Sequence, residues 1–142
     1  MMKTLKLLFV ATALSLVVFA CNKNQKVVRQ LNGEWKITEM KYNGDPVDKS
    51  EYENTTYTFE KCKVSKGDCD GEMKTVDPSK GTVTFPFTYS IDEKGTEITI
   101  NLEVFGFVES ETGEILEHSK KKFVWSVEDA DGDVTETTME KI

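Results

Sequence analysis

A strict alternation of apolar and polar residues is the feature that most constrains how this chain can fold. Between positions 83 and 91 every odd residue is apolar or aromatic, and the even residues are Thr84, Pro86, Thr88 and Ser90. The segments 98–104 and 123–127 repeat the pattern. Because side chains alternate between the two faces of a strand, a period of two indicates strands that are buried on one side. Pro86 lies on the polar face, where its missing N–H indicates an edge position or a bulge.

Turn-forming residues interrupt this alternation at short intervals. They occur at Asn43-Gly44-Asp45-Pro46, Gly67-Asp68, Asp77-Pro78, Lys94-Gly95, Thr112-Gly113 and Asp131-Gly132-Asp133. Such residues favour tight turns between antiparallel neighbours. We therefore predict strands over 33–42, 55–64, 70–76, 82–91, 96–108, 114–128 and 134–141, with a weak eighth near 47–52.

The spacing of these strands predicts an all-β domain. Consecutive strands joined by tight turns form an antiparallel up-and-down meander, which closes into a β-barrel or, as the alternative, packs as a β-sandwich. Gly106 lies inside the long segment 96–108, where a glycine allows the bend that a closed barrel needs. Helical structure is expected only as a single turn over 27–31.

The first 21 residues differ from the rest of the chain. Lys3 and Lys6 precede an almost wholly apolar run over 7–20, which ends at Ala20-Cys21. An apolar run of this length reaches about 21 Å as a helix, whereas the hydrocarbon of a bilayer is roughly 30 Å thick. The segment therefore predicts a cleaved secretory signal and not a membrane span.

The cysteine at the end of this segment resembles the lipobox cysteine of bacterial lipoproteins, which is acylated after cleavage. Phe19 is bulkier than the residue usual at that position, and a plain cleaved signal with Cys21 near the cut is the alternative. The resemblance implies a signal peptide over 1–20, a lipidated Cys21 with a tether over 21–30, and one β-domain over 31–142. Because no acidic cluster follows Cys21, we expect a protein of the bacterial cell envelope, anchored in the outer membrane and facing the periplasm.

The charge of the processed chain excludes some partners. Loss of residues 1–20 removes Lys3 and Lys6, so 16 basic residues stand against 25 acidic ones, a net charge of −9. Nucleic acids require a basic surface, so no nucleic-acid partner is expected. Anionic lipids are repelled as well, which leaves the lipid itself as the membrane anchor; two acyl chains are needed for stable attachment.

The two cysteines that remain after lipidation form a natural pair. Cys62 and Cys69 are separated by a short polar segment, and in an oxidising compartment such a pair predicts a disulfide. A metal site is the poorer alternative, because the spacing is not Cys-x-x-Cys and His118 is the single histidine.

Neither a metal site nor a catalytic site is expected elsewhere. The acidic run 128–133 has spacing similar to an EF-hand loop, but Val134 stands where that loop requires glycine, so a hairpin turn is the better interpretation. His118 lies between Glu117 and Ser119, and neighbours on a strand face opposite sides, which prevents a nucleophilic relay. We therefore predict a protein that is not an enzyme and needs no cofactor.

The start of the β-domain carries a motif of its own. Gly33-x-Trp35 is similar to the signature at the start of the first strand of lipocalins, and the chain resembles the lipocalin-like domains of bacterial envelope lipoproteins. The resemblance implies that Gly33 lets the chain bend into the barrel and that Trp35 plugs its closed end. Two departures stand out: Arg29 is the only arginine, so no late arginine can stack on Trp35, and the Thr-Asp-Tyr motif of that group is absent.

The apolar faces of the predicted strands suggest a function. An eight-stranded barrel can hold one small ligand, although the same large side chains could instead form a packed core. The candidate pocket consists of Tyr57, Phe59, Phe85, Phe87, Tyr89, Ile98, Ile100, Phe123 and Trp125. We therefore expect a non-catalytic protein that binds a small hydrophobic ligand; the alternative is an accessory lipoprotein that holds a protein partner through its outer surface.

Overall fold

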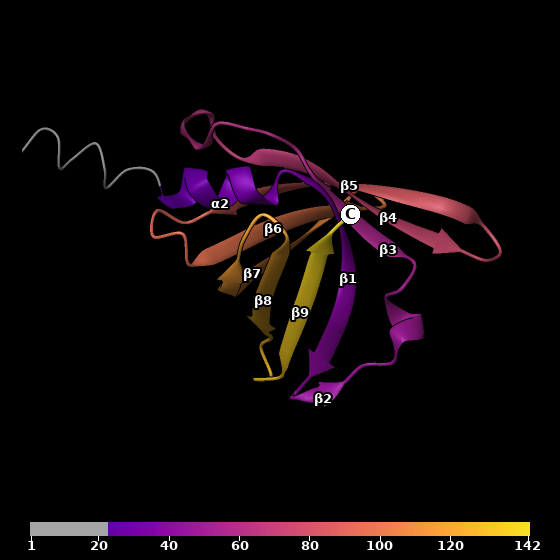
Figure 1. The fold of residues 1–142 in the computed structure, drawn as a ribbon. Helices are drawn as coiled ribbons and strands as arrows, with labels where there is room; N and C mark the ends of the chain where they lie inside the picture. Colours follow the sequence, from indigo (N-terminus) through magenta and orange to yellow (C-terminus); the bar gives the residue numbers. More distant parts are fainter. Residues whose placement is uncertain (1–22) are drawn as a thin grey trace, which may run out of the picture.

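The computed structural model describes residues 23–142 (Figure 1). The predicted signal peptide 1–20 and the lipidation of Cys21 lie outside the described residues. No helix among the described residues is long and apolar enough to span a bilayer.

Eight strands form a closed antiparallel barrel, which confirms the predicted meander and excludes the sandwich (Figure 1). Each strand pairs with the next along the chain, and β9 returns to pair with β1. A two-residue strand, β2 (Asp45–Pro46), adds to the end of β1. The barrel strands are β1 (Gly33–Tyr42), β3 (Thr55–Phe59), β4 (Cys69–Asp77), β5 (Gly81–Ile91), β6 (Glu97–Val104), β7 (Phe107–His118), β8 (Lys122–Glu128) and β9 (Val134–Lys141).

The barrel has its eighth strand because the chain turns at Phe105-Gly106 and not at Thr112-Gly113, where the sequence predicts a turn. Phe105 and Gly106 have φ values of 49° and 83°, so they form the two-residue turn with left-handed backbone that typically joins hairpin strands. The predicted strand 96–108 therefore ends at Val104, and the predicted turn at Thr112-Gly113 is wrong. Those two residues lie inside β7, and the long segment 114–128 divides into the end of β7 and all of β8.

Two further strand predictions need correction. The strand predicted over 55–64 ends at Phe59, and the chain then forms a loop with a short 3-10 helix, η2 (Val64–Lys66). The weak strand near 47–52 is replaced by another 3-10 helix, η1 (Lys49–Glu51), which Asp48 caps by accepting a hydrogen bond from the Ser50 N–H. The expected edge position of Pro86 is confirmed, since β5 pairs with β6 only from Phe87 onward.

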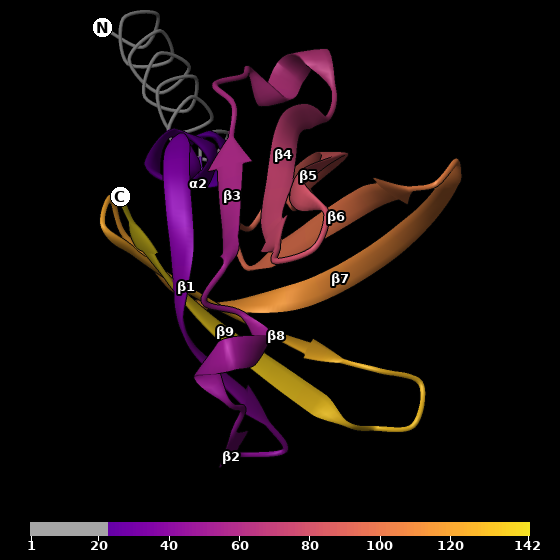
Figure 2. The same ribbon diagram turned by 90° about the vertical axis from the view of Figure 1, so that its right-hand side faces the viewer.

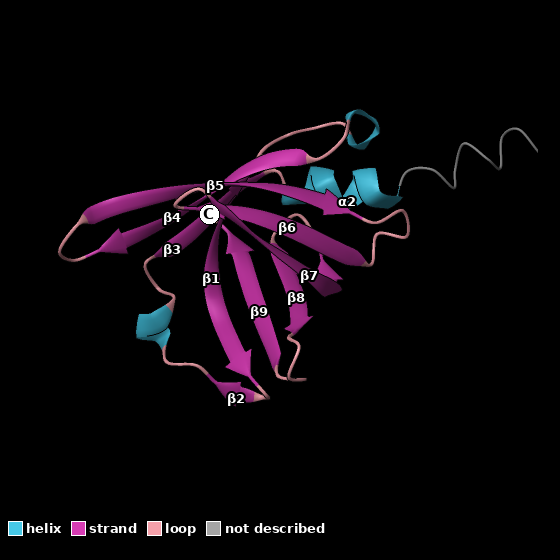
Figure 3. Cartoon of the chain, turned by 180° about the vertical axis from the view of Figure 1, so that it is seen from behind, coloured by secondary structure: helices cyan, strands magenta, loops and turns pink. Residues whose placement is uncertain are grey.

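A helix, α2 (Lys23–Leu31), replaces most of the predicted tether 21–30. Val27, Val28 and Leu31 are buried on one side of it, and Figure 3 shows the helix beside the end of β5. A single predicted turn becomes a nine-residue helix because its apolar face packs against the barrel. Short helices gain most of their stability from such contacts.

Trp35 lies at the barrel end that α2 covers, which we call the closed end. Its side chain is fully buried, and its indole N–H donates a 2.6 Å hydrogen bond to the Leu31 carbonyl.

Lys141 takes the place of the arginine that the sequence lacks. Its ammonium group lies 5.0 Å from the Trp35 ring centre and donates hydrogen bonds to the Gln30 and Asn32 carbonyls. Burial lowers the pKa of Lys141, and the nearby charge of Lys120 adds to this shift. Gly33, with φ of 129°, begins the strand beside the Lys141 side chain.

The predicted disulfide between Cys62 and Cys69 is confirmed. It closes the loop that contains η2, and a loop of this length contributes on the order of 2.5 kcal/mol by restricting the unfolded chain. Gln25 joins the same loop to α2: its amide donates to the Cys62 carbonyl and its carbonyl accepts from the Val64 N–H, both at 3.0 Å. The disulfide therefore stabilises the loop that holds α2 as well as the start of β4.

The described residues contain one hydrophobic core cluster. Buried apolar side chains run from Val27 to Met139, and the first and last long strands pair directly. The barrel therefore closes, and its core packs, within residues 23–142.

Candidate functional site

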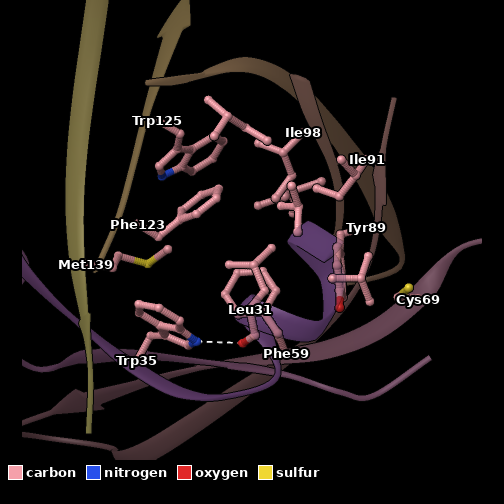
Figure 4. Close-up of a cluster of buried hydrophobic side chains, with 14 of the residues drawn as sticks. Leu31, Trp35, Phe59, Cys69, Tyr89, Ile91, Ile98, Phe123, Trp125 and Met139 are labelled. Atoms are coloured by element: carbon pink, nitrogen blue, oxygen red, sulfur yellow. Dashed lines mark hydrogen bonds between the residues drawn. The ribbon is translucent and has the colours of Figure 1, made fainter. Parts of the chain in front are cut away.

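The interior of the barrel is filled in the half next to the closed end. Of the nine predicted pocket residues, four are at most 1% exposed: Phe59, Tyr89, Ile98 and Phe123. Figure 4 shows them packed with Trp35 and Leu31 around the end of α2, and the Phe59 and Tyr89 rings meet edge to face with centres 5.1 Å apart. The structure places these four residues in the packed core.

The other half of the interior, which we call the open half, is less densely covered. Tyr57 and Phe85 are only partly buried although they lie on the inward face of β3 and β5. Met40, Met73, Leu102 and Val127 are likewise partly buried against the core. Solvent therefore reaches part of the apolar surface of these side chains at this end of the barrel. Phe87, Ile100 and Trp125, each at most 7% exposed, form the layer between the two halves.

Two acidic residues of β7 share this inward face. The register pairs Ile98 with Gly113, Ile100 with Glu111 and Leu102 with Glu109, without a shift. Because Ile98 and Ile100 are buried, their direct neighbours lie on the same face of the sheet, where the side chains of Glu109 and Glu111 are exposed. Sequence reasoning missed both glutamates, since the turn predicted at Thr112-Gly113 assigned them to a loop. With the turn placed at Phe105-Gly106, the alternation of faces along β7 would have assigned Glu109 and Glu111 to the same face as Ile115.

Tyr57 lies across the interior from these glutamates. Burial raises the pKa of its hydroxyl to about 12, and the negative charge of Glu111 adds to the shift. Three strands separate β3 from β7 along the sheet, so Tyr57 and Glu111 lie on opposite walls of the barrel. The hydroxyl is therefore protonated at neutral pH.

Trp125 carries an unpartnered hydrogen-bond donor. Its side chain is 7% exposed, and within the described part of the chain its buried indole N–H makes no hydrogen bond. Figure 4 shows the nitrogen on the side of the ring nearer Phe123 and Met139, facing the packed half. A buried donor without a partner costs about 1–3 kcal/mol, so this layer of the barrel is not optimised for stability.

A further apolar feature lies at the tip of the β6–β7 hairpin, which projects from the barrel in Figure 2. The Phe105 ring there meets the Phe85 ring edge to face, with centres 6.2 Å apart. Phe105, Phe107 and Val108 are 87%, 77% and 67% exposed. Val108 also lines a surface groove of about 480 Å³, together with carboxylates that include Asp70 and Glu72. Exposed apolar groups of this size often mark interaction surfaces.

The other polar residues considered in the sequence have structural roles. Asp129 accepts hydrogen bonds from the N–H groups of Asp131 and Asp133, which forms the predicted β8–β9 turn. His118 Nδ1 shares a 2.5 Å hydrogen bond with Gln30 Oε1 of α2. Within residues 23–142, no three His, Cys, Asp or Glu side chains are grouped as metal ligands would be.

Comparisons with known proteins agree with this architecture. The family model described as a lipocalin-like domain matches residues 31–125. The crystal structure of a lipocalin-like protein from Bacteroides uniformis is similar with a TM-score of 0.59 and 21% identity, covering 80% of this chain and 99% of that one. A redesigned β-barrel bound to DFHBI gives a TM-score of 0.51 at 16% identity, covering 81% and 98% of the two chains. No curated protein sequence matches the chain significantly.

Proposed function

Because the chain belongs to the lipocalin-like domain family, we propose that it binds a small, largely apolar molecule in the open half of its barrel. The observation that carries this proposal is the partial exposure of inward-facing apolar side chains, among them Tyr57 and Leu102, above a filled closed half. Barrels of eight strands have room for one small ligand. The redesigned barrel bound to DFHBI is an example of a small molecule held by a similar fold.

In this proposal the predicted pocket residues divide into walls and a floor. Tyr57 and Phe85 form part of the wall, and Phe87, Ile100 and Trp125 form the floor against which the apolar body of the ligand packs. Binding replaces solvent on apolar surface, which stabilises the complex by about 25 cal/mol for each Å² removed from water. The role is binding without catalysis.

Titration of the neutral naphthalene dye Prodan into a protein comprising residues 23–142 tests this proposal. We expect saturable binding at one site, with a change in Trp125 fluorescence. Leu102→Asp places a charge on the apolar wall and should weaken binding by about tenfold or more, because the charge must lose water when the dye enters. Asn101→Asp adds the same charge on the outward face of β6 and should leave the affinity unchanged. Non-saturable binding by the unmodified protein, or equal affinities for both variants, would rule the proposal out.

The alternative function is that of an accessory protein that holds a partner through its outer surface. The exposed side chains Phe105, Phe107 and Val108 at the β6–β7 hairpin favour it. A host protein that co-purifies in a fixed ratio and is lost on Phe107→Ser, with no dye binding in the barrel, would support this alternative.

We further propose that the chain is anchored to the bacterial outer membrane, on its periplasmic side, through an acylated Cys21. The N-terminal sequence supports this proposal, and α2 begins at Lys23, two residues after the cysteine. Since α2 covers the closed end, the lipid would hold the barrel by that end and leave the mouth facing away from the membrane.

Mass spectrometry of protein isolated from its own host tests the anchor. The mature chain should begin at Cys21 and carry the mass of acyl chains, and Cys21→Ala should accumulate as the uncleaved precursor. Cys62→Ala is the matched control, because it removes a cysteine without affecting lipidation. A mature chain without added acyl mass would contradict the proposal.

A further inference from the structure

We infer that the closed end of the barrel is a basic surface that docks on an anionic lipid membrane, where its lysines and its arginine contact the headgroup phosphates. The contact rests on the proposed membrane attachment and adds to it a surface that the protein itself provides. The basic side chains and the acylated Cys21 can be removed independently, so either contact can fail while the other stands.

Charge is divided between the two ends of the barrel. The processed chain has a net charge of −9, from which repulsion by anionic lipids is expected. The segments at the closed end are 23–32, 60–68, 92–96 and 119–121, and the connections at the opposite end are 43–54, 78–80, 105–106 and 129–133. The closed-end segments contain nine basic and four acidic residues, whereas the opposite connections contain two basic and seven acidic ones. The net charge therefore hides one basic end and one acidic end.

The helix that covers the closed end has charges of one sign only. Its apolar residues are buried against the barrel, whereas Lys23, Lys26 and Arg29 are exposed. α2 contains no acidic residue. Because Lys23 stands two residues after Cys21, this basic helix is the first element to follow the proposed anchor. A membrane that holds the anchor therefore lies next to the basic end of the barrel.

Two surface grooves meet at Arg29, the only arginine of the chain. The first has a volume of about 760 Å³, and the charged residues that line it with Arg29 are Lys120, Lys121 and Lys141 together with a single acidic residue, Glu140. The second is lined by two lysines of the disulfide loop and, among the described residues, by no acidic one. A planar guanidinium binds phosphate oxygens through two parallel hydrogen bonds. A headgroup phosphate at Arg29 would therefore have lysines on both sides.

The cations of this surface are free to bind an external anion. Among residues 23–142, no salt bridge involves Arg29, Lys120 or Lys121. Burial lowers the pKa of Lys141 and the charge of Lys120 adds to the shift, so like charges lie close together here. The turn that carries Lys120 and Lys121 is fixed, because the Ser119 hydroxyl accepts hydrogen bonds from two of its N–H groups. The cluster is thus formed before any lipid arrives.

The acidic end of the barrel is too distant to prevent docking. β9 runs between the two ends with eight residues, about 26 Å along the strand and about 20 Å along the axis of a barrel with tilted strands. The Debye length is about 10 Å at 0.1 M salt, so an anionic surface at the closed end senses mainly the basic residues. Each lysine or arginine near such a surface contributes about fivefold in affinity.

Vesicle flotation of the protein comprising residues 23–142 tests the proposal, because this chain lacks Cys21 and cannot be acylated. At 0.1 M salt, phosphatidylcholine vesicles with about 30% phosphatidylglycerol should bind it at least about tenfold more strongly than pure phosphatidylcholine vesicles. Salt at about 1 M should abolish this preference, because it screens the charges. Inorganic phosphate at constant ionic strength should not displace the protein, since a single ion contacts few of the cations.

Two double variants remove the same charge from opposite ends of the barrel. Lys120→Gln with Lys121→Gln should weaken binding to the anionic vesicles by about tenfold or more. Lys49→Gln with Lys80→Gln should weaken it by less than about twofold, because these lysines lie at the end that faces away from the membrane. All four side chains are exposed, so both variants should keep the fold, which circular dichroism checks.

Three results would overturn the proposal: equal binding to both kinds of vesicle, equal losses in the two double variants, or displacement by inorganic phosphate. Retention on poly-glutamate but not on anionic vesicles would also overturn it and would identify the closed end as a protein-binding surface. A mature chain without acyl mass would overturn the anchor alone, because the vesicle assay uses a chain without Cys21.

Discussion

Replacement of Trp35 by alanine should lower the free energy of unfolding by about 3–5 kcal/mol, the range typical of a fully buried tryptophan. The loss has three sources. The indole fills the closed end, its N–H satisfies the Leu31 carbonyl at 2.6 Å, and its ring faces the Lys141 ammonium at 5.0 Å. Denaturant unfolding of residues 23–142, followed by circular dichroism, measures this loss.

The second tryptophan provides the control. Trp35→Phe keeps an aromatic ring but leaves the Leu31 carbonyl unpaired, whereas Trp125→Phe removes an N–H that has no partner among the described residues. The first substitution should therefore cost about 1–3 kcal/mol more than the second, the usual penalty of a buried polar group left without a hydrogen bond. Equal costs would show that the Trp35 hydrogen bond contributes nothing to stability.

Replacement of Gly71 by alanine should destabilise the barrel by about 3 kcal/mol, as overpacking of a filled core does. A β-carbon at this position would overlap the Phe87 ring and would lie 2.7 Å from the Thr58 carbonyl oxygen. The ring and the neighbouring strand cannot both move without opening the β3–β4 pairing. Thermal unfolding monitored by circular dichroism measures the loss.

Two variants separate the sources of this effect. Gly71→Ala combined with Phe87→Leu should recover only part of the lost stability, because the conflict with the Thr58 carbonyl remains. Asp70→Ala, on the exposed face of the same strand, should change stability by less than about 0.5 kcal/mol. A Gly71→Ala protein as stable as the unmodified one would contradict the packing described here.

The sequence predicted the fold well where local chemistry alone determines structure. The alternation in β5 and the turns at Gly44, Gly95 and Gly132 identified a barrel meander, because pleat and turn geometry are local properties. The turn at Phe105-Gly106 was missed because phenylalanine is not a turn residue. Gly113 was misread as a turn, since its real neighbour, the Trp125 ring, comes from another strand and is invisible in local sequence.

The site was harder to predict for the same reason. Which face of β7 carries Glu111 depends on where its turn lies, and a shift of one residue exchanges the two faces. Lys141 reaches Trp35 only because β9 closes on β1. Sequence could name the large apolar residues, but only packing separates Phe59 in the filled half from Tyr57 in the open half.

Both ends of the described chain are fixed at the closed end: α2 covers it, and Lys141 bonds to the carbonyls of Gln30 and Asn32 beside it. The hairpin turns at the other end, such as Phe105-Gly106, take no part in these contacts. Under the proposed function, stability and recognition are therefore divided along the barrel axis. Exchange of the rim residues would then change the choice of ligand while the structure that keeps the barrel folded stays intact.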